Sequence, residues 1–254
     1  MAEEIKSKEI KPDEIMEFLK PRVGARFKTW LDICAHCSMC ADTCHYYLSS
    51  GRNPKMIPAH KVRFLKEILK KKRKVDKAYL EEIYKTIYYE CNMCRRCTLY
   101  CPFGIDIAMM ISLLRGTLLT QGMAPEGLRK AIENYNATGN QMAITKDDWV
   151  ETLQWCEEEA AAELVGLKIP IDKKGAKIMY TVNAREPKFY PQDIMEVAKI
   201  FHVAGEDWTL PSESGWDDTN LAMFCADVKT ARATVENTFK RAEELGVQQV
   251  AITE

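Results

Sequence analysis

Eight of the ten cysteines in this 254-residue chain fall into two short runs of identical spacing. Each run reads C-x-x-C-x-x-C-x-x-x-C; the first extends from Cys34 to Cys44, and the second from Cys91 to Cys101, with Pro102 directly after it. Three cysteines at these intervals can wrap one face of a body too large for a tight turn, and the fourth must approach from elsewhere. The fold therefore has to bring two segments distant in sequence together.

This spacing is typical of the ligands of two [4Fe–4S] clusters, in which the last cysteine of each run binds the cluster of the other run. Four thiolates also suit zinc, and disulfides are a further alternative. Structural zinc, however, usually takes paired C-x-x-C motifs without a third cysteine three residues on. The predicted ligand sets are Cys34, Cys37, Cys40 and Cys101 for one cluster, and Cys91, Cys94, Cys97 and Cys44 for the other.

The composition narrows the class of protein. The formal net charge is −1, and 46 % of the residues are hydrophobic, which is typical of a globular protein and gives no indication of nucleic-acid binding. The N-terminus has no apolar signal-peptide region, and no apolar stretch approaches the roughly 18 residues that span a bilayer. We therefore expect a cytoplasmic chain with reduced thiols, held at a membrane only through a partner.

Helical periodicity predicts the fold class around the cysteines: an α-helical, two-cluster ferredoxin-type domain followed by a partial α/β domain with a parallel sheet. Helices are expected from Pro12, over 25–33, over 60–74, after a cap at Asp76, and over 105–119. The expected divisions are an N-terminal arm and helix (1–24), the cluster domain (25–122), a helical connector (123–170) and the partial α/β domain (171–254).

Several side chains near these elements have two interpretations. The basic stretch from Lys70 to Lys74 is either a solvated helix end or a docking patch for an acidic partner or lipid head groups. His36, between two cysteines, either modulates a cluster potential or lies at the surface. Cys156 and the three methionines of the next helical region are expected to fill the core, the latter being Met109, Met110 and Met123.

The C-terminal third alternates strands and helices. Strands are expected over 177–182, 207–210 and 247–253, and helices over 191–204, 219–228 and 230–245. The expected inner face of the last helix consists of Ala231, Val235, Phe239, Ala242 and Leu245. This order predicts parallel β/α units. Since a parallel sheet with so few strands is small and the sequence stops directly after one, we expect the natural polypeptide to continue beyond Glu254.

Together with the cysteine runs, the segments 53–65 and 214–223 resemble the heterodisulfide-reductase iron–sulfur family, in the branch of the K subunit of the Dsr membrane complex of sulfate reducers. The resemblance implies that the clusters supply electrons to a C-terminal site whose Cys-Cys-Gly motifs hold an unusual cluster. Here Val182-Asn183-Ala184 and Ser214-Gly215-Trp216 stand where a first such repeat is expected. Cys225, alone in that region, is expected to be a buried helix residue. The chain should therefore conduct electrons without a complete catalytic site of its own.

The leading functional hypothesis is an oxidoreductase subunit that relays electrons towards a thiol–disulfide site in anaerobic sulfur metabolism, as in sulfate reduction. The resemblance implies a membrane cytochrome b-type subunit, other redox subunits and a small redox-cysteine protein as partners, at the inner face of the membrane. The alternative is a cluster-carrying wire for a separate anaerobic dehydrogenase of the glycerol-phosphate or lactate type. A third hypothesis gives the clusters a purely structural role in a binding module.

Overall fold

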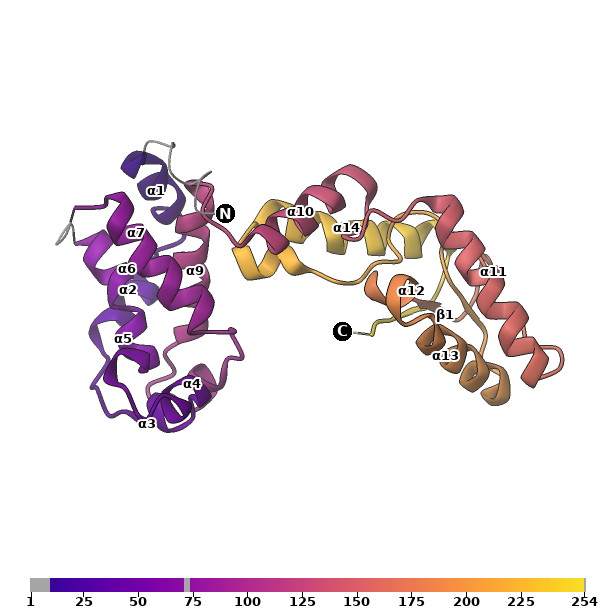
Figure 1. Cartoon of the computed structure of the whole chain (residues 1–254), viewed down its shortest axis with the longest axis horizontal. Helices are drawn as coiled ribbons and strands as arrows, with labels where there is room; N and C mark the ends of the chain where they lie inside the picture. Colours follow the sequence, from indigo (N-terminus) through magenta and orange to yellow (C-terminus); the bar gives the residue numbers. More distant parts are fainter. Residues whose placement is uncertain (1–9, 71–73, 254) are drawn as a thin grey trace. The chain divides into compact units, whose positions relative to one another are not determined.

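The computed structural model describes residues 10–70 and 74–253, which form two compact units (Figure 1). Unit 1 comprises Met1–Glu126 and Met223–Asp227, and unit 2 comprises Gly127–Ala222 and Val228–Glu254. The chain is mostly helical, with one small sheet in unit 2. The short segment Met223–Asp227 groups with unit 1 although its neighbours in sequence belong to unit 2.

Unit 1 is built from short helices packed around one long apolar helix, α9 (Ile107–Thr120). Most of the side chains of α9 are buried, and α1 and α7 pack directly against it. The close approach of α1 depends on Gly116, because a Cβ there would lie 2.1 Å from Cζ of Phe18. The other elements are α1 (Pro12–Leu19), α2 (Ala25–Asp32), α3 (Met39–Asp42), α4 (His45–Ser49), the 3-10 turn η2 (Pro54–Met56), α5 (Pro58–Lys61), α6 (Arg63–Leu69), α7 (Lys77–Tyr84), the π-helical turn η3 (Lys85–Tyr89) and α8 (Arg96–Leu99).

Local sequence signals set several of these helix ends. The carboxylate of Asp76 accepts a hydrogen bond from the Tyr79 backbone N–H at 3.0 Å, which confirms it as the cap of α7. Asp106 caps α9 in the same way, through the Met109 N–H at 3.0 Å. The single helix expected over 60–74 is wrong: α5 and α6 are separate helices that meet at Val62, whose ψ of −3° departs from helical geometry. A continuous apolar period gives no sign of a break of this kind.

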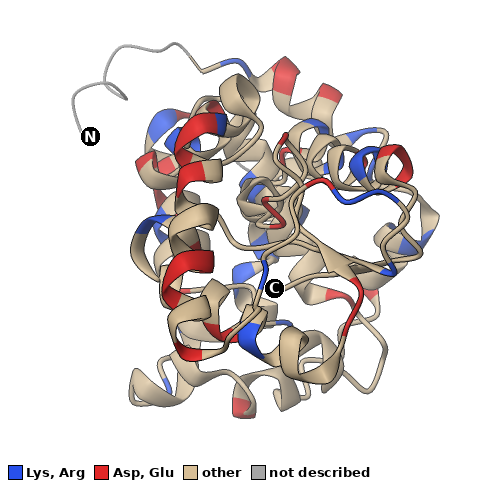
Figure 2. Ribbon diagram, turned by 90° about the vertical axis from the view of Figure 1, so that its right-hand side faces the viewer, with Lys and Arg blue, Asp and Glu red and all other residues tan. Residues whose placement is uncertain are grey.

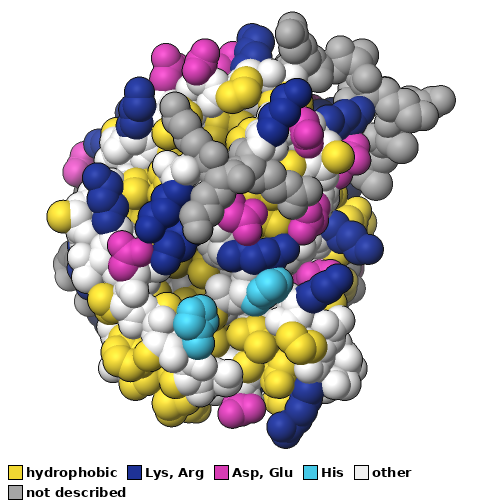
Figure 3. All heavy atoms as spheres, turned by 90° about the vertical axis from the view of Figure 1, so that its left-hand side faces the viewer, with side chains coloured by type: hydrophobic (Ala, Val, Ile, Leu, Met, Phe, Trp, Pro, Cys, Tyr) yellow, Lys and Arg dark blue, Asp and Glu magenta, His cyan; other side chains and the backbone are white. Residues whose placement is uncertain are grey.

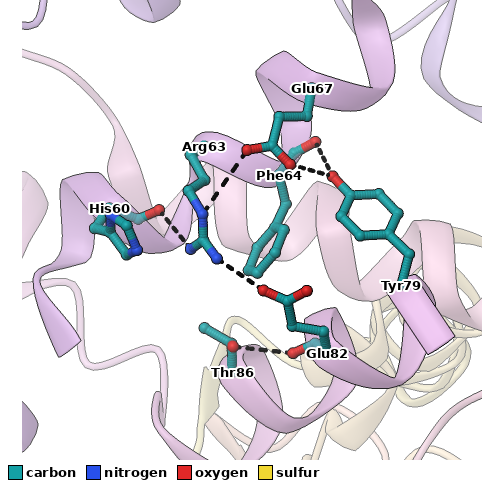
Figure 4. Close-up of polar contacts among 7 residues, drawn as sticks. All are labelled: His60, Arg63, Phe64, Glu67, Tyr79, Glu82 and Thr86. Atoms are coloured by element: carbon teal, nitrogen blue, oxygen red, sulfur yellow. Dashed lines mark hydrogen bonds and ion pairs between the residues drawn. The ribbon is translucent and has the colours of Figure 1, made fainter. Parts of the chain in front are cut away.

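A polar network fastens α5 and α6 to α7 (Figure 4). Arg63 donates to the His60 carbonyl at 3.2 Å and pairs with Glu82 at 2.9 Å. The Tyr79 hydroxyl donates to Glu67 at 2.7 Å, so two polar contacts join α6 to α7 beside the buried Phe64. The hairpin spans the sequence between the two cysteine runs, and this network fixes how the second run returns towards the first.

Two expectations about unit 1 concerned the three methionines and the basic stretch from Lys70 to Lys74. Met110 and Met123 are buried as predicted, but Met109 is 50 % exposed, because it lies one residue, or about 100°, round the helix from Met110. In the basic stretch, Lys70 lies near Asp32 at 3.5 Å. Lys71, Lys72 and Arg73 lie outside the described residues, so the docking patch stays a prediction.

Unit 2 contains a three-stranded parallel sheet in the order β2-β1-β3, as the alternation of strands and helices predicted. Ile178 of β1 pairs with Trp208 on one side and Gln249 on the other. α11 and α13 cover the face that presents Tyr180, and α14 covers the face that presents Met179. The elements are α10 (Glu126–Thr138), α11 (Lys146–Glu163), β1 (Ile178–Tyr180), α12 (Arg185–Phe189), α13 (Pro191–Ala204), β2 (Trp208–Thr209), the 3-10 turn η4 (Leu221–Cys225), α14 (Val228–Leu245) and β3 (Gln249–Ala251).

The predicted inner face of the last helix is confirmed at Ala242 and Leu245, which are buried, but it is wrong by about a quarter of a turn in the first half of the helix. Val235 and Phe239 are 48 % and 59 % exposed, while Thr234 and Thr238 are buried. Threonine hydroxyls can be buried in a helix because they donate to the carbonyl four residues back, as Thr238 does to Thr234 at 3.3 Å. The helix expected over 219–228 is also shorter, reduced to the turn η4.

Acidic and basic segments are interspersed along the ribbon of the protein (Figure 2). Many of these charges form surface pairs, such as Lys168 with Glu157 at 2.7 Å and Lys199 with Glu163 at 2.7 Å. Among the described helices, none combines the length and the apolar character needed to cross a bilayer.

Candidate metal centres

The two cysteine runs adopt the same unusual backbone conformation. In the first run His36 and Ser38 have positive φ angles of 52° and 64°. At the equivalent positions of the second run Met93 and Arg95 have φ angles of 59° and 63°. A left-handed conformation costs a non-glycine residue about 1–2 kcal/mol, so this repeated strain indicates a shape that the site requires.

In each run the left-handed residues lead into a short helix that carries the third cysteine. Cys40 is the second residue of α3 and Cys97 the second residue of α8, and these two helices contact one another. Asp106 anchors α8 to α9, since its carboxylate accepts from Thr98 at 3.0 Å and from Arg95 at 2.9 Å. The two runs therefore lie side by side.

The first cavity of unit 1 is bordered by three cysteines of the first run and by the last cysteine of the second run. It has a volume of about 410 Å³ and extends beyond the thiols towards Trp30 and Lys66. His36 also borders this cavity while its side chain is exposed, as one of its two interpretations required. The bordering thiols are Cys34, Cys37, Cys40 and Cys101.

The second cavity is smaller, at about 30 Å³, and has the reciprocal composition. It is walled by Tyr46, Lys61 and Ile111, among others. Its bordering thiols are Cys91, Cys94 and Cys97 from the second run and Cys44 from the first.

The electrostatics reflect this grouping. Burial raises the pKa of the Cys40 thiol, and the nearby thiols of Cys34, Cys37 and Cys101 raise it further. Burial likewise raises the pKa of Cys97 to about 12, and the thiols of Cys91, Cys94 and Cys44 raise it further, as does that of Cys40 from the other group. Thiols in such a setting ionise when a metal takes the place of the proton, so each group of four is suited to a thiolate-bound cation.

Each group of four matches the donor set of a [4Fe–4S] cluster, which takes four cysteine thiolates. Within residues 10–70 and 74–253, no group of three or more Cys, His, Asp or Glu side chains converges on the position of a single metal ion. The four cysteines of each group border one cavity.

Exposed apolar side chains collect at the end of unit 1 that carries α3 and α4. Met39 and Leu48 on these helices are 47 % and 46 % exposed, and Leu99 on α8 is 77 % exposed. Figure 3 shows hydrophobic side chains gathered at this end, below the visible histidines. The cysteine-bearing helices α3 and α8 thus lie next to the solvent.

Two cations beside the second cavity were not foreseen from the sequence. Lys61 is 1 % exposed and Arg115 is 3 % exposed. Burial raises the pKa of Cys91, and the charges of Arg115 and Lys61 oppose that rise. The sequence did contain an indication that Arg115 is buried, because Arg115 lies within the apolar stripe of α9 between Ile111 and Leu118.

The two remaining cysteines lie away from the cavities and are buried. Cys156 of α11 packs in the core of unit 2, with its Sγ 3.6 Å from the Pro191 carbonyl oxygen. Cys225 is buried in unit 1, where its thiol lies near Tyr88. The expectation that both are packing residues is confirmed.

In unit 2 the two segments expected at a first Cys-Cys-Gly repeat lie next to each other. The Val182 N–H donates to the Trp216 carbonyl at 2.8 Å. Asp217, only 1 % exposed, accepts backbone hydrogen bonds from Gln141, Ala184 and Thr219 at 2.8, 3.2 and 3.1 Å. A buried carboxylate and the stacked rings of Trp149 and Trp216 thus occupy this place in the fold.

Known iron–sulfur proteins are similar to this chain in sequence. The model of a 4Fe-4S dicluster domain matches residues 30–105, which include all eight cysteines of the two runs. The Hdr-like menaquinol oxidoreductase iron-sulfur subunit 2 of Archaeoglobus fulgidus is 28 % identical over 248 residues, covering 87 % of this chain and 43 % of the relative. The Hdr-like menaquinol oxidoreductase iron-sulfur subunit of Archaeoglobus profundus is 27 % identical over 273 residues, covering 95 % of this chain and 46 % of the relative. The chain thus spans less than half the length of these relatives, and no solved structure matches it.

Proposed function

We propose that this chain, which belongs to the heterodisulfide-reductase-related iron–sulfur proteins, is an electron-transfer subunit of an Hdr-like menaquinol oxidoreductase. The observation that carries the proposal is the pair of cavities, each bordered by three thiols of one cysteine run and the fourth thiol of the other. In this proposal unit 1 is an α-helical ferredoxin-type domain extending over residues 25–122. It holds two [4Fe–4S] clusters.

When bound, such clusters supply one-electron transfer, and the protein holds and insulates them. The predicted ligands are Cys34, Cys37, Cys40 and Cys101 for the first cluster and Cys91, Cys94, Cys97 and Cys44 for the second. Since each site borrows a thiol from the other run, neither site can be completed unless α3 and α8 are packed together. Loading with iron is therefore expected to be coupled to the folding of unit 1.

The names of the relatives describe menaquinol oxidoreductases, which supports placing this chain in a quinol-linked complex. We propose that a membrane cytochrome b-type subunit oxidises the quinol and passes electrons to this chain, which lies peripherally at the inner face of the membrane. The acceptor in this proposal is a thiol–disulfide site in anaerobic sulfur metabolism, such as sulfate reduction, with a small redox-cysteine protein as the substrate. In unit 2 the buried Asp217 and Trp216 stand where the resemblance implies a first Cys-Cys-Gly repeat, so the described residues of unit 2 do not supply that site.

The ligand assignment can be tested by anaerobic reconstitution followed by iron and sulfide counting and electron paramagnetic resonance. The wild-type chain is expected to bind about eight iron and eight sulfide ions, as two four-iron clusters require. Cys101→Ser should then perturb the same cluster signal as Cys34→Ser, and Cys44→Ser the same signal as Cys91→Ser. The matched control Cys156→Ser should keep the full iron content.

Two outcomes would contradict the proposal. If Cys44→Ser and Cys34→Ser perturbed the same signal, each run would ligate within itself. If the wild-type chain bound zinc and no acid-labile sulfide, the electron-transfer function would be refuted altogether.

A further inference from the structure

The second cysteine group lies beside two buried basic side chains that have no acidic partner. Lys61 and Arg115 are 1 % and 3 % exposed, and within the described part of the chain neither forms an ion pair with a carboxylate. Burying a cation without a counter-charge is costly, because it loses its hydration. A negative charge close to these two cations would stabilise them in their buried positions.

Both side chains are fixed on the backbone that leads into the second run. The Lys61 ammonium borders the second cavity and donates to the Glu90 carbonyl oxygen, with its Nζ 5.2 Å from the centre of the Tyr46 ring. The Arg115 guanidinium donates to the carbonyl oxygens of Cys91 at 2.6 Å and Ile87 at 2.9 Å. Neither charge can turn towards solvent without breaking these contacts.

Arg115 has two further contacts on its other side. It donates to the Phe224 carbonyl oxygen at 3.1 Å, and its guanidinium carbon lies 4.6 Å from the centre of the Tyr88 ring. Carbonyl dipoles and aromatic faces stabilise a cation in part, but they carry no net charge. The positive charge therefore remains uncompensated beside Cys91.

The basic side chains around the first cavity are arranged differently. Arg63 and Lys66 border it, but their side chains are 30 % and 37 % exposed. Arg63 pairs with Glu82 at 2.9 Å, and Lys66 pairs with Asp32 at 3.1 Å. Solvent and these carboxylates screen both charges, so the two cysteine groups differ in their electrostatic surroundings.

We infer that Lys61 and Arg115 act as positioning and charge-setting residues that make the second cysteine group the more easily reduced of the two sites. The inference rests on the proposed function, since it requires both groups to hold clusters. Reduction adds one electron from a one-electron donor and neither makes nor breaks a bond. The added negative charge is stabilised most where buried positive charge is close and unscreened. An electron that enters unit 1 therefore settles at the site of Cys44, Cys91, Cys94 and Cys97.

A redox titration of the reconstituted full chain, followed by electron paramagnetic resonance, tests this inference. The signals are assigned with Cys44→Ser and Cys101→Ser. In the wild type the second site should have the higher midpoint potential. Arg115→Gln and Lys61→Met should each disfavour reduction of the second site at least tenfold, which is about 59 mV for one electron, and leave the first site within twofold. Lys66→Met is the matched control near the first cavity. Loss of the Lys66 charge should change the reduction equilibrium of each site by less than about twofold.

The charge-retaining variants Arg115→Lys and Lys61→Arg separate charge from packing. They should keep the second site close to its wild-type potential, and they serve as the test if the neutral variants fail to load iron. The inference is overturned if the neutral variants load fully and their potentials do not shift, or if both sites shift equally. It is also overturned if the charge-retaining variants, like the neutral ones, fail to load iron. A wild-type chain without iron–sulfur signals would instead refute the proposed function itself.

Discussion

Asp217 is the carboxylate around which unit 2 closes, and its removal gives a quantitative test of the fold. Its side chain accepts from three buried backbone N–H groups and from the Gln141 side-chain amide at 3.4 Å. These donors belong to the loop before α11, the segment after β1 and the start of the segment leading to η4. Asp217→Ala leaves all of them without an acceptor.

The expected loss of stability on removing the Asp217 carboxylate follows from these hydrogen bonds. Each unsatisfied buried backbone donor costs about 1–3 kcal/mol, and relief of the cost of burying a carboxylate offsets part of that sum. We therefore expect Asp217→Ala to lower the free energy of unfolding of unit 2 by about 3–5 kcal/mol. Asp217→Asn keeps one acceptor oxygen but turns an amide towards the Gln141 N–H, so about 1–3 kcal/mol is expected.

Urea unfolding of the full chain, followed by tryptophan fluorescence, measures this loss, because Trp30 alone among the five tryptophans lies in unit 1. With a urea dependence of about 1–3 kcal/mol per M, the midpoint of the unit 2 transition should fall by about 1–5 M for Asp217→Ala. Asp207→Ala is the matched control, since Asp207 is an exposed aspartate paired with Lys173 and should cost less than about 1 kcal/mol. Equal midpoints for the two alanine variants would refute the reasoning.

Two further predictions concern buried side chains of unit 2. Burial raises the pKa of Cys156 to about 11, so its thiolate fraction at pH 8 is about 10⁻³. The rate of its alkylation by iodoacetamide, measured by mass spectrometry, should therefore be low and rise about tenfold per pH unit up to that pKa. Rapid alkylation at pH 8 in the folded chain would contradict this burial. On α14, Leu245→Ala should lower the free energy of unfolding by about 2–5 kcal/mol, whereas Phe239→Ala should change it by less than about 0.5 kcal/mol. A loss for Phe239→Ala as large as that for Leu245→Ala, measured from the urea midpoints, would mean that Phe239 faces inward as the sequence predicted.

The electrostatic difference between the two cysteine groups bears on the direction of electron transfer. If the second site is the easier to reduce, a donor would be expected to approach the first group, which borders the larger and more open cavity. The acceptor would then take electrons from the side of α4 and α8. The exposed Leu48 and Leu99 on these helices offer an apolar surface for that contact.

The sequence alone determined what is local in this protein. The spacing of the two runs indicated the class of cofactor, since a ligand motif of this kind depends on residues a few positions apart. Asp76 as a helix cap, the helix from Pro12 and the three strands were predicted for the same reason. The parallel order of the sheet followed because strands joined through helices can pair in few ways.

The tertiary structure decided whatever depends on residues distant in sequence. The break between α5 and α6, the rotation of α14 onto its threonines and the exposure of Met109 all reflect which neighbours a helix meets, and periodicity carries no such information. No sequence pattern indicated that Lys61 is buried, and only the position of Arg115 within the apolar stripe of α9 pointed to its burial. Only the packing of α5 and α9 against the second run buries their charges beside Cys91, because hydration is lost through the fold as a whole and not through the local sequence.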